Sequence, residues 1–175
     1  MITLLARGML WLTIFAIPLE NMMVIPGAGT ISRVLGLGAF LFVSLSVLVT
    51  GRIRRLTRIH LAIGLFLIWS IISLFWSIDH QETFNRLWTY PQLAILVWLI
   101  WECSCVPAVH RSLLQAYVLG AYISAFDTLH IFLLGQEVDY MRFAASGFDP
   151  NDLGLILALG IPLAWYLMIT SNHRV

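Results

Sequence analysis

The sequence contains no lysine and little charge of either sign. Only 11% of its 175 residues are charged, and all ten basic residues are arginine. An average soluble domain carries about 25% charged residues, so this composition is not typical of a soluble globular protein. Because 60% of the residues are hydrophobic, the composition instead indicates an integral membrane protein.

Cysteine is also scarce. The two cysteines, Cys103 and Cys105, are too few for a disulfide framework, and no second cysteine pair completes a zinc-type site. We therefore expect two inert thiols and no bound metal. The sequence also lacks a Gly-rich phosphate loop, an HExxH pattern and a nucleophile elbow, which argues against an ATPase, a metalloprotease or a serine hydrolase. No cofactor is expected.

Several apolar runs approach 20 residues in length. As a helix, the run at 31–49 would be about 28 Å long, close to the ~30 Å hydrocarbon core of a bilayer. A spanning segment must satisfy its own backbone hydrogen bonds in lipid, so we predict an all-α fold. The chain is expected to be a single integral membrane domain, a polytopic bundle of about six transmembrane helices. The expected spans are residues 4–19, 31–49, 61–76, 87–101, 112–134 and 151–169.

Four arginines lie between the second and third expected spans, at Arg52, Arg54, Arg55 and Arg58. Short arginine-rich loops stay in the cytoplasm, so this loop predicts that both termini are cytoplasmic. We interpret it as a topology signal, with anionic membrane lipid as a second partner, and we expect no nucleic acid partner. Most acidic residues then fall outside: Glu20, Asp79, Glu82, Glu137, Asp139 and Asp149.

Residues 142–152, RFAASGFDPND, combine a basic residue, a turn and a helix start. The expected turn residues are Gly147, Asp149, Pro150, Asn151 and Asp152. Asp149 is placed to cap the last helix, with Pro150 at its first position, where a missing N–H is harmless. The helix start offers free N–H groups and Arg142 offers a guanidinium, so together they could hold a pyrophosphate. The alternative is a well-capped helix beside a surface arginine.

Asp127 and His130 form a second candidate site. They are three residues apart in the fifth expected span and so share a face of the helix. An ionisable residue inside a membrane usually faces the interior of the bundle or a watery cavity, where this pair could move a proton or bind a polar head group. The alternative is a structural pair satisfied by a neighbouring helix. Arg33 and Arg86 are also expected outside, near the membrane.

Three stretches resemble the N-terminal half of the bacterial O-antigen ligase and O-antigen polymerase-like membrane protein superfamily. They are IPLENMMVIPGAGTISRVLGLGAF at 17–40, SLFWSIDHQETFNRLWTYPQLAILVWLI at 73–100, and RFAASGFDPNDLGLILALGIPLAW at 142–165. The last is the most specific, because an arginine and then Gly-Phe-Asp-Pro-Asn open a membrane helix. The resemblance covers essentially the whole chain.

The resemblance implies a bacterial inner-membrane protein that transfers or polymerises glycan carried on undecaprenyl diphosphate, for surface polysaccharide or lipopolysaccharide. The acceptor would be lipid A–core or another glycan. By the same resemblance, Arg142 and Arg86 are the candidate diphosphate contacts and Arg33 is a weaker one. No catalytic residue is assigned, because the family places its catalytic external loop further along than Val175. We therefore expect the N-terminal part of a longer protein, or a second chain that supplies the rest.

Two other functions remain open from the residues alone. One is a small transporter or flippase subunit that uses Asp127 and His130 as a proton relay. The other is a non-catalytic membrane scaffold or fragment, which would bind no ligand of its own.

Overall fold

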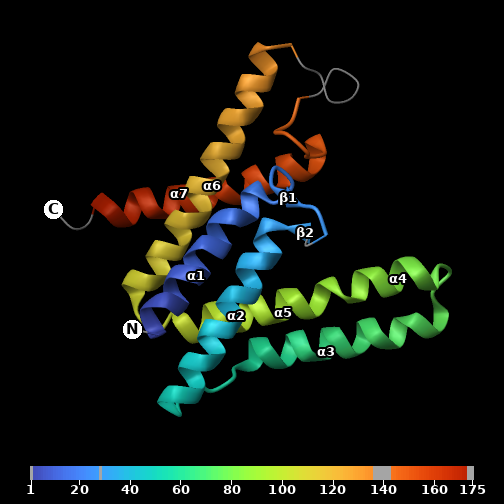
Figure 1. Ribbon diagram of the computed structural model, residues 1–175, viewed down its shortest axis with the longest axis vertical. Coiled ribbons are helices and arrows are strands. Elements are labelled where there is room, and N and C mark those ends of the chain that lie inside the picture. The colour runs from blue at the N-terminus through green and yellow to red at the C-terminus, as the bar shows by residue number, and fades with distance from the viewer. Residues whose placement is uncertain (1, 28, 136–142, 173–175) are drawn as a thin grey trace.

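The structure is a computed structural model that describes residues 2–27, 29–135 and 143–172. Helices dominate these residues, as the sequence predicts, and one small sheet accompanies them (Figure 1). The elements are α1 (Ile2–Ala16), η1 (Ile17–Leu19), β1 (Val24–Ile25), β2 (Gly29–Thr30), α2 (Ile31–Thr50), α3 (Arg58–Ile72), η2 (Ser73–Trp76), α4 (His80–Leu87), α5 (Thr89–Cys103), α6 (Pro107–Leu133) and α7 (Pro150–Asn172), where η marks a 3₁₀ helix.

Within the described ranges, five helical segments are long and apolar enough to cross a membrane. They are Ile2–Leu19, Ile31–Thr50, Arg58–Trp76, Pro107–Leu133 and Pro150–Ser171. These match five of the six expected spans. The remaining one, expected at 87–101, forms α5, which has 15 residues. At 1.5 Å per residue, α5 is about 22 Å long, shorter than the ~30 Å hydrocarbon core. The chain is thus an all-α membrane protein.

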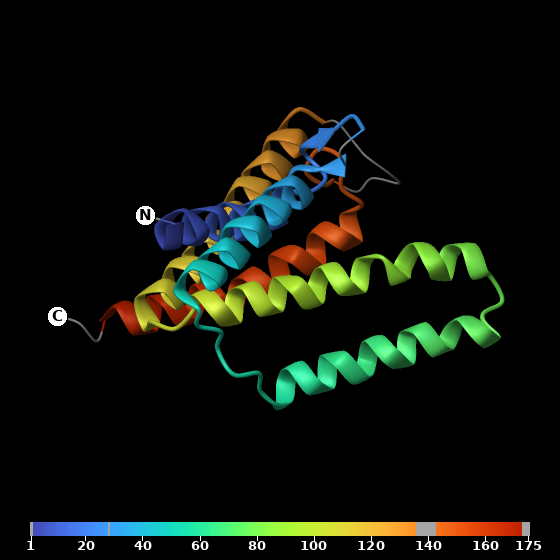
Figure 2. The same cartoon turned by 60° about the horizontal axis from the view of Figure 1, so that its bottom comes forward.

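The helices run between two ends of the molecule (Figure 2). One end contains the start of α1, the connection between α2 and α3, and the connection between α5 and α6; we call it the arginine-rich end. The other contains the β1–β2 hairpin, α4 and residues 143–149; we call it the hairpin end. Helix α5 also runs from one end to the other, so the chain returns to the arginine-rich end after α4 (Figures 1 and 2).

The connector after the first span contains a sheet that the sequence did not predict. Val24 pairs with Thr30, and Ile25 with Gly29, in an antiparallel register. Gly27 and Gly29 have φ values of 81° and 85°, which are accessible to glycine at little cost. The all-α prediction therefore holds for the spans but not for this loop, where two glycines allow the chain to turn back on itself.

The core lies where α1 meets α2, α5 and α6. Small residues bring these helices close together: Ala6 of α1, Ala39 of α2 and Ala116 of α6 are all buried. Gly38 contributes as well, because a Cβ at this position would lie 2.5 Å from Met9 Cε. Close approach at small residues is the usual way in which membrane helices gain packing contacts.

Candidate functional site at the hairpin end

Residues 143–149 fold back onto the end of the first span. Ala144, Ala145 and Phe148 are buried and pack together with Leu153 of α7. Met22, from the connector after η1, packs against the same cluster. The turn before α7 is thus fixed to a segment more than 100 residues earlier in the chain.

Gly147 makes the closest of these contacts. Its φ is 80°, and a Cβ added there would collide with the backbone carbonyl oxygen of Asn21. No other residue can take this backbone conformation at such close range without displacing the neighbouring chain. The glycine of the GFDPN stretch therefore allows the turn to lie directly on the backbone at Asn21.

Asp127 fastens the turn from the other side. Its Oδ2 accepts a hydrogen bond of 2.9 Å from the backbone N–H of Ser146. His130 lies one turn further along α6 and is exposed. Among the described residues, no hydrogen bond joins Asp127 to His130. The observed partner of Asp127 is the loop before α7, whereas the structural alternative expected a neighbouring helix.

The start of α7 is capped as the sequence predicts. Oδ1 of Asp149 accepts from the Asn151 N–H at 2.8 Å, and its carbonyl oxygen accepts from the Leu153 N–H at 3.0 Å. Pro150 is the first helical residue, and Asp152 lies exposed in the first turn. The Asp149 carboxylate thus takes one free N–H of the helix start, and an anion bound here must approach beside it.

A second polar group lies beside the turn, on the β1–β2 hairpin. The Thr30 hydroxyl donates to Glu20 Oε1 at 3.0 Å and lies 3.0 Å from the Ser32 hydroxyl. Arg33, in the first turn of α2, is exposed and folds over the hairpin: its Cδ lies 3.5 Å from where a Cβ on Gly29 would stand. Sequence analysis missed the contact between Glu20 and Thr30, because it depends on the unpredicted hairpin.

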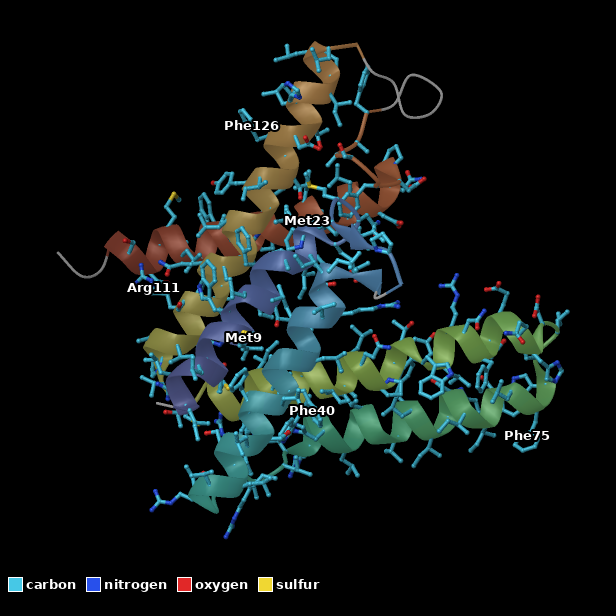
Figure 3. The ribbon with its side chains drawn as sticks, in the orientation of Figure 1. Met9, Met23, Phe40, Phe75, Arg111 and Phe126 are labelled. Carbon is cyan, nitrogen blue, oxygen red and sulfur yellow. The ribbon has the colours of Figure 1, made fainter. Side chains whose placement is uncertain are left out.

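Of the other two arginines expected to bind diphosphate, only Arg86 lies among the described residues. Arg142 lies outside the described residues. Arg86 lies exposed on α4, at the tip of the α3–α5 pair and apart from the start of α7 (Figures 1 and 2). Figure 3 shows the same separation between Phe75, next to that tip, and Met23, next to the β1–β2 hairpin. The structure thus brings Arg33 to the β1–β2 hairpin, whereas Arg86 lies apart from it on α4.

The structure also shows the positions of the two cysteines. Cys103 is buried and Cys105 is exposed, and both are free thiols. The described residues hold no group of three or more His, Cys, Asp or Glu side chains that could bind a metal ion.

Comparisons with protein-family models, with curated proteins and with solved structures found no match. Among the described residues, five helices long and apolar enough to cross a membrane indicate a helical membrane protein, with a polar turn and hairpin at one end.

Proposed function

We propose that this chain binds undecaprenyl diphosphate-linked glycan at its hairpin end, as part of an O-antigen ligase-like or polymerase-like glycan transfer system. One observation carries the proposal. Two of the three stretches that resemble that superfamily, 17–40 and 142–165, come together at one place, where Gly147 lies on Asn21 and Phe148 packs with Met22. Residues that share a substrate site need this kind of juxtaposition, although they are far apart in sequence.

The proposed orientation follows from the distribution of charge. The arginine-rich end carries Arg7, Arg52, Arg54, Arg55, Arg58 and Arg111, with Glu102 as the acid. The hairpin end carries Glu20, Asp79, Glu82, Asp127, Asp149 and Asp152, with Arg33 and Arg86. By the positive-inside rule the arginine-rich end faces the cytoplasm of a bacterial inner membrane. In this arrangement α5 is a short additional span, the fourth in chain order, which brings the number of spans to six. Both termini are then cytoplasmic, and the hairpin end is external.

Within this proposal, Arg33 and Arg142 hold the diphosphate. Arg33 stands over the hairpin, and Arg142 directly precedes the turn in sequence. A guanidinium offers a planar set of donors that matches phosphate oxygens. Arg86 is a contact for a more distant part of the substrate, since α4 lies apart from the turn (Figure 1). No described residue is assigned to activation of the lipid A–core or glycan acceptor, which we assign to a partner chain or a further segment.

The test is binding of undecaprenyl diphosphate to the purified chain in detergent. Arg33→Ala and Arg142→Ala should each weaken binding roughly ten- to hundredfold, because a charge-assisted hydrogen bond contributes about 1.5–3 kcal/mol. Arg111→Ala is the matched control, since it removes the same charge at the arginine-rich end.

Two results would contradict the proposed function. The first is no binding by the wild-type chain, which would favour a non-catalytic scaffold. The second is an equal loss in all three variants, which would mean that the ligand responds to net charge and not to the hairpin end.

A further inference from the structure

An apolar groove runs along α3 at the arginine-rich end. The groove is open and has a volume of about 460 Å³. Its lining lies within residues 56–68 and includes Thr57, His60, Leu61, Gly64, Leu65 and Ile68. These positions recur at helical spacing, so they form one face of α3. At Gly64, a Cβ would meet no atom within 4 Å, which leaves the floor of the groove open.

The polar end of this groove is rigid. The Thr57 N–H donates to His60 Nδ1 at 3.2 Å, and the two residues form a capping box at the start of α3. The His60 ring also stands edge-on to the Trp101 ring of α5, with 5.5 Å between centroids. We call this polar end of the groove, at Thr57 and His60, its closed end, because the Trp101 ring lies beside it; the apolar residues of the groove, which we call its apolar channel, follow along α3.

Arginines surround the closed end, and one of them has a structural role. Arg54 stacks on the Trp101 ring, with its guanidinium carbon 3.5 Å from the ring centroid, and its Nη1 donates to the Trp101 carbonyl oxygen at 2.8 Å. Arg55 and Arg58 are exposed, and none of the hydrogen bonds of the described residues uses their side chains. Two exposed guanidinium groups, next to the groove in sequence, are thus available to an anionic ligand.

Arg58 is aligned with the groove. It is the first residue of α3, three positions before Leu61 and seven before Leu65, so all three share a face. Side chains on a helix lean toward its N-terminus, which directs the Arg58 guanidinium past the closed end toward the membrane surface. An anionic group there would lie directly above the apolar channel.

The length of the groove matches one leaflet. From Thr57 to Ile68 the helix rises about 16 Å, close to half of the ~30 Å hydrocarbon core. Leu61 and Leu65 are 66% and 59% exposed, so these apolar walls are open to the lipid phase. The chemistry of the groove therefore changes from cationic to apolar over the depth at which a phospholipid changes from head group to acyl chain.

We infer that this groove binds one anionic phospholipid of the leaflet at the arginine-rich end. One acyl chain lies along Leu61, Gly64 and Ile68, and the phosphate pairs with Arg58 and Arg55. The site is separate from the proposed diphosphate site, because the two lie at opposite ends of the molecule. It does not depend on glycan transfer.

The experiment measures binding of dioleoyl phosphatidylglycerol and dioleoyl phosphatidylcholine to the delipidated chain in detergent, by native mass spectrometry. Phosphatidylglycerol should bind roughly twenty-fivefold more tightly, since each of the two arginines near the anionic lipid contributes about a fivefold preference. Gly64→Leu should weaken phosphatidylglycerol binding about tenfold, the loss expected for roughly two buried methylenes. Arg58→Gln should weaken it about fivefold.

Each variant has a matched control. Gly154→Leu on α7 adds the same side chain where a Cβ also meets no atom within 4 Å. Arg111→Gln removes the same charge from α6, which contributes no residue to the lining of the groove. Both should bind like the wild type. The inference is overturned if Gly64→Leu binds like Gly154→Leu, if the two lipids bind equally, or if glycerol 3-phosphate alone displaces the lipid.

Discussion

At the scale of single residues, Gly147 shows how one position can join two distant parts of the chain. Its positive φ alone would favour glycine, as in many turns. The carbonyl oxygen of Asn21 adds a second constraint, because it occupies the space that a side chain would need. The positive φ and the contact with Asn21 each add to the free-energy cost of a side chain at position 147. Gly135 has a positive φ without such a contact, so a comparison of the two positions separates the two costs.

We predict that Gly147→Ala destabilises the chain more than Gly135→Ala. Gly135 has a φ of 67°, but a Cβ there meets no atom within 4 Å, so alanine adds only about 1–2 kcal/mol of backbone strain. Gly147→Ala incurs that strain and also displaces Asn21, which adds about 1–3 kcal/mol. Thermal unfolding in detergent, followed by circular dichroism, measures the difference. Equal loss in both variants would mean that the turn does not press on Asn21.

The residues of the site were only partly predictable from the sequence. Asp149 and Pro150 were, because a cap and a first-turn proline are local signals. The partner of Asp127 was not, because Ser146 is 19 residues away and reaches it only through the fold of the loop. At the other end of the molecule, the role of His60 in capping α3 was not predicted. The N3 position of a capping box is usually Glu or Gln, and here a histidine takes that position.

At the scale of elements, the connection between α2 and α3 is attached to α5 through Trp101. Its ring stacks with Arg54, and its Nε1 donates to the Arg55 carbonyl oxygen at 3.2 Å. The Arg54 N–H donates to Glu102 Oε2 at 3.0 Å. The sequence indicated a cytoplasmic loop here, but the structure shows that one of its arginines also holds the loop in place.

We predict that Trp101→Leu releases residues 52–57 from α5. The substitution removes a cation–π contact of about 0.5–1 kcal/mol and a hydrogen bond of about 1 kcal/mol. A loss of about 2 kcal/mol raises amide exchange in this segment roughly thirtyfold. Trp88→Leu is the control, since Trp88 is 63% exposed and directly precedes α5, at the end opposite to Trp101. Similar exchange in both variants would show that Trp101 does not fasten the loop.

The elements themselves follow the apolar pattern closely, with two departures. Five of the expected spans are long apolar helices because runs of about 20 apolar residues have few alternatives in lipid. The fourth is shorter than a typical span, since Trp88 separates α5 from the polar helix α4. The β1–β2 hairpin was missed because two-residue strands leave no alternating pattern to detect.

At the scale of the whole molecule, charge is divided between two ends. Among the described residues, six arginines and one carboxylate lie at the arginine-rich end, and six carboxylates and two arginines lie at the hairpin end. The proposed diphosphate site requires the hairpin end to be external. The positive-inside rule, which supports that orientation, requires the arginine-rich end to be cytoplasmic. The proposed diphosphate site therefore requires the two ends of the molecule to face opposite sides of the membrane.

The measurement that tests this claim most directly is labelling of spheroplasts with a membrane-impermeant maleimide. The chain carries its own reporter, because Cys105 is exposed at the arginine-rich end while Cys103 is buried. The wild-type chain should label only after the membrane is opened. The Ser146→Cys, Cys105→Ser variant should label in intact spheroplasts, since Ser146 is exposed at the hairpin end. Equal labelling of both chains before the membrane is opened would contradict the arrangement.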